Sequence, residues 1–396
     1  MSSTPAGPAE NAAEPGRPPA VVAVGPELAP QRLARYGRQL LLPGFTADAQ
    51  RRLAGARVLV VGAGGLGSAS IPYLAGAGVG TIGIIDTDVV ELSNLHRQVS
   101  HGIHDLGRSK VASLADTIAE IDPEITVRRH EVRLDSSNAL DLFAGYDLIM
   151  DGSDNFATRY LTNDAAALAG LPLVWGAILR YSGQASVAYA AYGPNYRDLF
   201  PTPPAPGEVL SCSVGGVLPG VCATIGAIMS TEAVKLITGI GEPLIGRVTT
   251  YDARTGRFRE LGYRRSPDAA PITELIDYEL FCGQDTAPKV ARDSIDAPEL
   301  AALLAAGAPL QLVDVREPFE AQIARIDGAT LIPLGTVADE IEQLRSEVPV
   351  VVYCHFDSRS RRAAEILRAG GITGVQWLEG GIDAYARLAD TSLARY

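Results

Sequence analysis

The feature that most constrains this chain is a glycine-rich turn between a buried apolar run and a helical segment. Residues 57–61 (RVLVV) lead directly into GAGGLG at 62–67, which has the spacing G-x-G-x-x-G. The glycines of the turn are Gly62, Gly64, Gly65 and Gly67. Such a turn lets the backbone approach a phosphate group, whose charge the amides at the start of the helix stabilise. Asp86 ends the next apolar run, where its carboxylate can accept from a ribose hydroxyl.

Strand and helix patterns alternate along most of the chain. Strand patterns occupy 56–64, 81–88, 125–133, 146–155 and 171–179, with helical patterns at 68–79, 109–122 and 226–239 and a strand pair within 246–263. A second such series, with strand patterns at 310–317, 348–354 and 375–381, begins near Ser294. Alternation of this kind predicts an α/β protein with a Rossmann-like, doubly wound and mostly parallel sheet, followed by a small α/β domain.

Composition marks the expected domain boundaries. Residues 1–28 are rich in Pro, Ala, Gly and Glu, which predicts a disordered tail. Residues 29–263 then form the nucleotide-binding domain, 264–292 a linker, and 293–396 a second domain. Each folded part is long enough to bury a core of its own.

Charge and cysteine spacing exclude several classes of protein. The formal net charge of −12 argues against a surface for nucleic acid or anionic lipid. The start of the chain lacks the pattern of a signal peptide, and we expect the apolar segment 216–240 to be a core helix because it contains Glu232 and Lys235. The four cysteines are far apart, which predicts free thiols in a reducing compartment and a cytoplasmic location.

Polar and cationic residues follow the second strand pattern. Asn94, Arg97 and Lys110 lie there, and Lys110 is one of only three lysines in the chain. Ammonium and guanidinium groups together suit a triphosphate, whose charge must be balanced before attack at phosphorus. NAD binding is the alternative that the glycine turn and Asp86 leave open, and a solvated helix start is the alternative for Lys110.

Asp154, within DGSDN at 151–155, follows the fourth strand pattern. The carboxyl ends of parallel strands are where open α/β sheets bind ligands. One carboxylate with phosphate oxygens and water is a common way to hold Mg²⁺. We therefore expect Asp154 to bind Mg²⁺; the alternative is that Asp154 caps the following helix, a role that Asp151 could also fill.

Cys354 occupies a second candidate site. The segment 348–360 (VPVVVYCHFDSRS) gives a buried strand, Cys354, four further residues, Arg359 and then a helix. A loop wrapped over a helix start, with an arginine nearby, stabilises an anionic thiolate or persulfide. We expect Cys354 to be a nucleophile and Arg359 its cationic partner, the alternative being a core cysteine at the end of a strand. Cys222 and Cys282 are interpreted as structural.

The motifs together resemble one family. RYGRQ (35–39), GAGGLG (62–67), Asp86, SNLHRQ (93–98), Lys110 and DGSDN (151–155) occur in the order and spacing of the MoeB/ThiF-type adenylating enzymes, relatives of ubiquitin-activating E1 enzymes. With the loop at Cys354, the whole chain resembles the MoeZ/MOCS3-like adenylyltransferase/sulfurtransferases, in which such a domain is fused to a rhodanese domain.

The resemblance implies roles for the residues. Gly65 lies along the phosphates of ATP, Asp86 binds the ribose, and Asn94, Arg97 and Lys110 surround the phosphates. Asp154 holds Mg²⁺, and Arg38 reaches the ATP from the other subunit of a homodimer. Cys212, in a loop of small residues, can act on the acyl group; a packing cysteine is the alternative.

Two departures from the family pattern affect these expectations. Asp357 stands where the family often has glycine, and it adds negative charge beside an anion site. If Asp357 repels thiosulfate, sulfur would come from a protein persulfide such as that of a cysteine desulfurase. The positions that hold two C-x-x-C pairs in many relatives are Asn195, Asp198, Ala269 and Ile272 here, so we expect no structural zinc.

The expected reaction is the ATP-dependent adenylation of the C-terminal Gly-Gly carboxylate of a ubiquitin-like sulfur carrier, followed by sulfur transfer from a persulfide on Cys354. An adenylating enzyme with an inactive rhodanese tail and an NAD-dependent oxidoreductase are the rivals. The pathway stays open among molybdopterin, thiamin, cysteine, tRNA thiolation and secondary metabolism.

Overall fold

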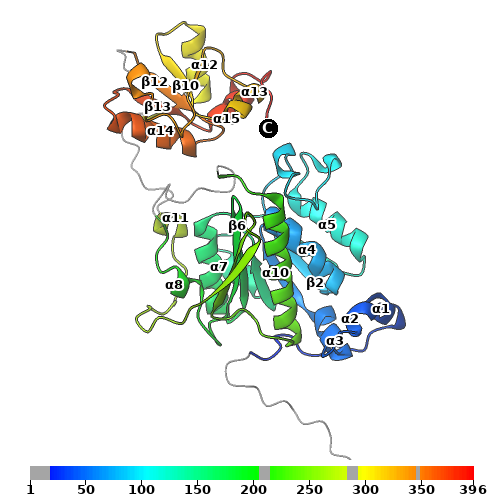
Figure 1. Ribbon diagram of the computed structural model, residues 1–396. Coiled ribbons are helices and arrows are strands. Elements are labelled where there is room, and N and C mark those ends of the chain that lie inside the picture. The colour runs from blue at the N-terminus through cyan, green and yellow to red at the C-terminus, as the bar shows by residue number, and fades with distance from the viewer. Residues whose placement is uncertain (1–17, 205–214, 283–292, 345–347) are drawn as a thin grey trace, which may run out of the picture. The chain divides into compact units, whose positions relative to one another are not determined.

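The computed structural model describes residues 18–204, 215–282, 293–344 and 348–396 (Figure 1). The chain divides into two compact units, with the boundary between Gln284 and Asp285. Both are α/β structures built on a sheet, so the α/β fold expected from the alternating patterns is confirmed.

The first unit contains an eight-stranded sheet with the order β3-β2-β1-β4-β5-β6-β7-β8. Its strands are β1 (Arg57–Val61), β2 (Thr81–Ile85), β3 (Thr126–His130), β4 (Leu148–Asp151), β5 (Leu173–Leu179), β6 (Ser182–Ala188), β7 (Arg247–Asp252) and β8 (Arg257–Gly262). Strands β1 to β5 are parallel, whereas β6, β7 and β8 pair antiparallel. The sequence pattern missed β6, because alternation of small and polar residues (SGQASVA) carries no strong apolar signal.

Helices cover both faces of this sheet. They are α1 (Pro30–Arg35), α2 (Gly37–Leu40), α3 (Ala47–Gly55), α4 (Gly65–Ala77), α5 (Lys110–Ile121), α6 (Ala139–Phe143), α7 (Phe156–Ala169), α8 (Tyr196–Leu199), α10 (Pro219–Thr238) and α11 (Tyr278–Phe281). One apolar core joins one face to α3, α4, α5 and α10, and a second joins the other face to α6, α7, α8 and α11 (Figure 1).

Helix α10 is long and apolar enough to cross a membrane by length and composition. It packs instead against α4, β5 and β6 within the first unit. Its buried Glu232 accepts from the backbone N–H of Leu244 at 2.8 Å and pairs with Lys235. The expectation of a core helix in this segment is therefore confirmed.

The strand order places β1 beside both β2 and β4, with all three parallel. The connection after β1 leads to β2 on one side of β1, and the connection after β3 leads to β4 on the other side. The carboxyl ends of β1 and β4 therefore border the switch point where doubly wound sheets bind ligands. The glycine turn follows β1, and the segment that contains Asp154 follows β4. The topology thus brings these two predicted elements to one edge of the sheet.

Segments at both borders of the first unit pack onto it. Val22 is buried in the α10 side of the core, and the N–H of Val21 donates to the carbonyl of Leu236 at 3.0 Å. Within the stretch expected to be a linker, Tyr278 donates to the Asp164 carboxylate at 2.6 Å. The structure therefore places residues 18–28 and 264–282 with the first unit.

The second unit is a five-stranded parallel sheet with the order β11-β10-β12-β13-β9. Its elements are β9 (Ser294–Ile295), α12 (Ala297–Ala305), β10 (Gln311–Asp314), α13 (Pro318–Ile323), β11 (Thr330–Leu331), β12 (Val350–Tyr353), α14 (Ser358–Ala369), β13 (Val375–Leu378) and α15 (Gly381–Leu388). The strands β9 and β11 were not expected, because each has only two residues. One apolar core lies against α12 and α15, and a separate apolar core lies against α14.

The contact between α10 and α4 depends on a glycine. A Cβ at Gly226 would lie 2.6 Å from the Cβ of Ala69, whereas a Cβ at Gly220 of the same helix would meet nothing within 4 Å. We expect Gly226→Ala to destabilise the first unit by about 1–3 kcal/mol through overpacking, and Gly220→Ala to be neutral or slightly stabilising. Urea unfolding followed by Trp175 fluorescence would measure both; equal effects would contradict the prediction.

Candidate functional site

The glycine turn after β1 is built by close backbone approaches that no side chain would allow. Gly62 has φ +93°, and a Cβ at Gly67 would lie 2.1 Å from the carbonyl oxygen of Gly62. A Cβ at Gly62 would meet the carbonyl oxygen of Gly152, after β4, at 3.1 Å. Helix α4 begins at Gly65, so its first amide groups border this turn. The turn has the geometry that the G-x-G-x-x-G spacing predicts.

Asp86, directly after β2, supports the turn. Its carboxylate accepts from the N–H of Ala63 at 2.7 Å and from the N–H of Asp88 at 2.8 Å. A carboxylate has room for further donors beyond these two. Asp86 can therefore hold the turn and still accept from a ribose hydroxyl.

His101 is a second support that the sequence analysis missed. Its Nδ1 lies 2.8 Å from Ser113 Oγ, and its Nε2 lies 3.4 Å from the carbonyl oxygen of Ala63. Burial lowers the pKa of His101, and the charge of Lys110 lowers it further. A neutral ring is thus favoured beside the turn. A single histidine carries no motif, so nothing in the sequence pointed to it.

Lys110 is the first residue of α5, and its side chain is buried. Its Nζ donates to Asp88 Oδ2 at 2.7 Å, although the Asp88 carboxylate itself is largely exposed. The carboxylate holds the ammonium group next to the end of β2. The alternative of a solvated helix start does not hold for the Lys110 side chain, because that side chain is buried.

Arg97 and Asn94 lie in the polar segment between β2 and α5. Asn94 is buried, and its Oδ1 accepts from the N–H of Glu91 at 3.3 Å. Arg97 is half-buried and donates from Nη1 to the carbonyl of Ser93 at 2.9 Å. The same Nη1 also lies 3.0 Å from His96 Nε2, and these two contacts leave Nε and Nη2 of the guanidinium available.

Asn155, and neither aspartate, caps the helix that follows β4. Asn155 Oδ1 accepts from the N–H of Thr158 at 2.8 Å, so the alternative in which Asp154 or Asp151 caps α7 is wrong. Asp151 is buried and accepts from the N–H of Ser153 at 2.8 Å. Asp154 is exposed and forms no hydrogen bond or ion pair with the described residues. Its carboxylate is thus available to a cation.

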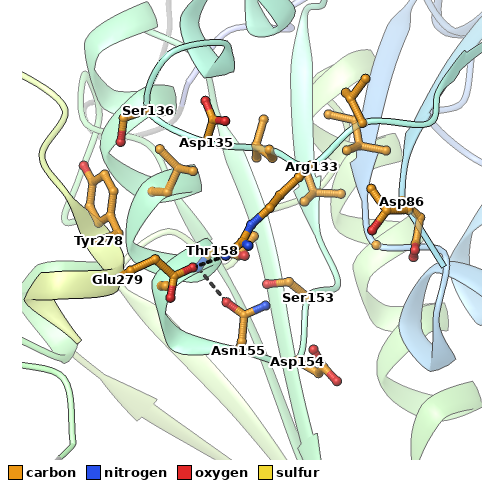
Figure 2. A pocket seen from close by; sticks show the side chains of 18 of the residues that line it. Asp86, Arg133, Asp135, Ser136, Ser153, Asp154, Asn155, Thr158, Tyr278 and Glu279 are labelled. Carbon is orange, nitrogen blue, oxygen red and sulfur yellow. Dashed lines mark hydrogen bonds and ion pairs between the residues drawn. The ribbon is translucent and has the colours of Figure 1, made fainter. Parts of the chain in front are cut away.

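A cavity of about 1020 Å³ opens where these segments meet (Figure 2). Of the predicted site residues, Gly62, Asp86 and Asp154 line it; Asn94, Arg97 and Lys110 are not among the described lining residues. Apolar contacts come from Val132, Leu134, Ala157 and Leu161, and polar ones include Asp88, Asp135, Ser153, Asn155 and Thr158. This mixture of an apolar wall and convergent polar groups is typical of a small-molecule site.

The outer wall of the cavity includes residues that the sequence analysis assigned to the linker. Ile276, Tyr278 and Glu279 line it, and the carbonyl of Ile276 accepts from Ser136 Oγ at 2.6 Å. Figure 2 shows Arg133 extending towards Glu279, with which it forms an ion pair. The composition of this stretch gave no reason to place it beside the glycine turn.

Two buried polar atoms near the turn have no hydrogen-bond partner within the described part of the chain. They are Gln98 Oε1 and Ser153 Oγ. The Gln98 side chain lies beside Gly64, and the backbone of Ser153 lies beside Gly62. Buried polar atoms without partners are uncommon in native proteins, so a pair of them on both sides of the turn is consistent with a ligand there.

Cys354 follows β12 at the start of a loop that leads into α14. The residue is buried, and its Sγ lies 3.5 Å from Ser360 Oγ in the first turn of the helix. The carbonyl oxygens of Cys354 and His355 accept from the N–H groups of Ile382 and Asp383, at 2.9 and 3.1 Å. A Cβ at Gly381 would lie 2.5 Å or less from three carbonyl oxygens of the loop. The loop is therefore clamped by the start of α15.

Arg359 is held by a carboxylate that the sequence analysis did not single out. Its Nη1 and Nη2 donate to Glu320 Oε2 and Oε1 at 2.6 and 2.7 Å. Burial by itself raises the pKa of Glu320, but the hydrogen bonds from Arg359 and from the N–H of Glu317 outweigh it and lower that pKa. Burial lowers the pKa of Arg359, and Glu320 together with the nearby Cys354 raises it overall. The pair is charged and fixed beside the thiol.

Asp357 does not strain the loop. Its φ of −137° lies outside the left-handed region that favours glycine. Its Oδ1 accepts from the N–H of Gly380 at 2.8 Å, and Arg361 forms an ion pair with Oδ2. These contacts partly neutralise the charge of Asp357, and they join the loop to Gly380, the residue before α15.

The remaining predicted residues are distributed as follows. Cys212 lies outside the described residues, so the structure gives no information on its role. Cys222 and Cys282 are buried, in agreement with a packing role.

Arg38 on α2 is exposed and forms no ion pair with the described residues. Within the described ranges, no group of three His, Cys, Asp or Glu side chains could hold a metal ion.

Comparison with known proteins decides the family. Residues 36–270 match the model of the ThiF family, and residues 296–388 match that of the rhodanese-like domain. The chain belongs to the ThiF family. The second domain matches the separate rhodanese-like model. The resemblance inferred from the motifs is therefore confirmed for both domains.

Similar proteins share both domains. The chain is 50% identical over 387 residues to the probable adenylyltransferase/sulfurtransferase MoeZ of Mycobacterium tuberculosis, covering 96% of this chain and 99% of that protein. It is 38% identical over 386 residues to the adenylyltransferase and sulfurtransferase MOCS3 of Drosophila grimshawi, covering 92% and 86%. This ThiF-family protein is accordingly an adenylyltransferase and sulfurtransferase, and the oxidoreductase alternative is set aside.

Solved structures support the fold of the first unit. The chain superposes on Escherichia coli MccB with a TM-score of 0.55 and 19% identity, covering 63% of this chain and 75% of MccB. A structure of MccB with ATP gives a TM-score of 0.54 and 21% identity, covering 60% of this chain and 73% of MccB. At these identities the likeness establishes a shared fold.

The lowered pKa of Glu320 predicts a pH dependence of stability. A carboxylate whose pKa is lower in the folded than in the unfolded state stabilises the fold above its ordinary pKa of 4.5, and this stabilisation is lost as the pH falls through the lower value. We expect Glu320→Gln to destabilise the second unit by about 1–3 kcal/mol at neutral pH, with the difference shrinking below pH 4.5.

Urea unfolding in a Trp175→Phe background, where Trp377 is the remaining tryptophan, measures this effect. The control is Glu365→Gln, which removes an exposed ion pair with Arg362 and should change little. A difference between wild type and Glu320→Gln that does not vary with pH would contradict the prediction.

Proposed function

We propose that this protein adenylates the C-terminal carboxylate of a ubiquitin-like sulfur-carrier protein with ATP and then converts the carboxylate to a thiocarboxylate with sulfur from Cys354. The observation that carries the proposal is the combination of the two sites. One unit has a tight glycine turn at a helix start beside a cavity, and the other has a thiol with a fixed guanidinium. Activation of a carboxylate and delivery of sulfur are the two half-reactions that such sites can supply.

ATP would bind with its phosphates along Gly65 and the start of α4 and its ribose at Asp86. The carrier carboxylate attacks the α-phosphorus, a P–O bond forms, and pyrophosphate leaves with the bonding electrons. Asn94, Arg97 and Lys110 would stabilise the developing charge. Lys110 Nζ uses one donor on Asp88, and its two other donors could bind phosphate oxygens.

Asp154 fits a role as the protein ligand of Mg²⁺. It lines the cavity and its carboxylate forms no contact with the described residues. Proteins commonly hold Mg²⁺ through one or two carboxylates together with phosphate oxygens. When bound, Mg²⁺ supplies charge neutralisation at the phosphates.

Sulfur transfer would begin with a persulfide on Cys354. Thiosulfate or the persulfide of a cysteine desulfurase are candidate donors; with thiosulfate, the thiolate attacks the outer sulfur and sulfite leaves. The terminal sulfur of the persulfide then attacks the acyl-adenylate carbon, AMP leaves, and an acyl disulfide to Cys354 forms. A second thiol, for which Cys212 is the candidate, would attack the Cys354 sulfur, release the thiocarboxylate and leave a disulfide that a thiol reductant restores.

We propose further that the enzyme works as a homodimer in which Arg38 completes the nucleotide site of the partner. Arg38 is exposed and its guanidinium has no ion pair with the described residues. The neighbouring Leu41 and Leu42 are 74% and 55% exposed, which is unusual for leucines beside one another. A cytoplasmic location accords with the thiol chemistry, and molybdopterin biosynthesis is one of several pathways such a carrier could serve.

Incubation with purified candidate carriers, ATP, Mg²⁺ and a sulfur donor tests the function. We expect intact mass spectrometry to show one carrier oxygen replaced by sulfur. Lys110→Ala and Asp154→Asn should lower AMP formation about 100-fold or more, the range for loss of one charge-stabilising group. Cys354→Ser should still activate the carrier carboxylate but yield no thiocarboxylate.

The matched control is Asp141→Asn, which changes an exposed aspartate on α6 away from the cavity lining. It should retain the wild-type rate. AMP formation by Lys110→Ala and Asp154→Asn at the wild-type rate would overturn the proposed nucleotide site, and thiocarboxylate formation by Cys354→Ser would overturn the sulfur route.

Subunit mixing tests the role of Arg38. Arg38→Ala and Lys110→Ala should each abolish AMP formation alone, whereas a mixture of equal parts should recover about one quarter of the wild-type rate. Half of randomly formed dimers are mixed, and each has one intact site. Mixing without recovery, under conditions where exchange of labelled subunits is demonstrated, would show that the site does not include the partner's arginine.

A further inference from the structure

Tyr396 connects the support of Arg359 to a buried ion pair deep in the second unit. Its hydroxyl lies 2.7 Å from Arg316 Nη1, which donates to it, and 3.2 Å from Glu320 Oε1, to which it donates. Arg316 is fully buried and is fixed by Asp314 through contacts of 2.8 and 2.6 Å. The hydroxyl is therefore anchored on one side and directs its proton at the carboxylate on the other.

The ring of Tyr396 also contacts the loop that bears the thiol. Its centroid lies 4.2 Å from that of His355, the residue after Cys354, in an edge-to-face arrangement. The preceding Arg395 is held by Asp383 of α15 at 2.9 Å. Tyr396 is thus connected to the loop in two ways. Its ring packs against His355, and its hydroxyl binds Glu320, which in turn binds Arg359.

Glu320 can orient Arg359 only if its own carboxylate is fixed. Arg359 takes both carboxylate oxygens, and the N–H of Glu317 donates to Oε2 at 3.0 Å. The Tyr396 hydroxyl supplies the remaining side-chain donor, to Oε1. A hydrogen bond to a carboxylate from a hydroxyl that itself accepts from a cation is stronger than one between neutral groups.

We infer that Tyr396 is a positioning residue for sulfur transfer at Cys354. Its hydroxyl fixes the Glu320 carboxylate, Glu320 holds the Arg359 guanidinium, and Arg359 stabilises the anionic sulfur. The inference rests on the proposed role of Cys354 and extends it to a residue far from the Cys–Arg loop in sequence. Tyr396 does not touch the reacting sulfur, so it acts through the carboxylate.

The rate at which iodoacetamide alkylates Cys354 tests this role, because the thiolate is the reacting form. We expect Tyr396→Phe in the full-length protein to slow alkylation at neutral pH by about 3- to 10-fold, which is less than the loss of a direct hydrogen bond to a charged group would give, because Tyr396 acts through Glu320 and Arg359. Peptide mass spectrometry separates Cys354 from the other cysteines. Formation of the carrier thiocarboxylate should slow by a similar factor, with an unchanged rate of pyrophosphate release in the first turnover, because adenylation precedes the sulfur step.

Tyr385→Phe is the matched control, since Tyr385 is buried in the same unit and its hydroxyl has no hydrogen bond to the Cys354 loop. It should leave the alkylation rate unchanged. In a Glu320→Gln background, Tyr396→Phe should have no further effect, because the carboxylate through which it acts is absent.

Two outcomes would overturn the inference. One is a wild-type alkylation rate in Tyr396→Phe. The other is an equal loss in the Glu320→Gln background, which would assign the effect to ring packing against His355. Failure of the proposed function would look different, because Cys354→Ser would then form thiocarboxylate while the alkylation results stood unchanged.

Discussion

The proposed nucleotide site of this enzyme depends on the close approach of two strand ends. Gly62 and Gly67 meet within a distance that excludes any Cβ, and the Gly62 backbone also meets that of Gly152 after β4. These approaches bring the start of α4 and the loop that contains Asp154 to one edge of the sheet. Gly62 of the turn and Asp154 both line the cavity at this edge, and a helix start with a nearby carboxylate suits a metal-bound phosphate group.

Carboxylates hold the essential cations in both units. Asp88 binds the Lys110 ammonium, and Glu320 binds the Arg359 guanidinium through two hydrogen bonds. An unpaired buried charge would be strongly destabilising, so each cation needs a partner while no anion is bound. Because the guanidinium has five donors and Glu320 uses two, Arg359 keeps donors for an anionic sulfur, and the Lys110 ammonium likewise keeps two donors beyond its bond to Asp88.

Motifs with fixed short spacing were predicted well. The glycine turn, the cysteine–arginine loop and the mostly parallel sheet follow from local patterns, because backbone conformation and strand burial are set by neighbouring residues. Other features lack such a pattern. Strand β6 has weak apolar alternation, His101 is a lone histidine, and Asn155 rather than an aspartate caps α7 because the chain turns one residue later than expected.

The sequence by itself determined the α/β class, the phosphate-binding turn, the nucleophile candidate and the family, since each rests on residue types at fixed spacing. Only the tertiary structure decided which side chains distant in the chain meet. It brought Ile276–Glu279 to the nucleotide cavity, Glu320 to Arg359, and Tyr396 to Glu320. Contacts of this kind depend on how strands and helices pack across the sheet, and residues that are 39 to 76 positions apart leave no periodic pattern.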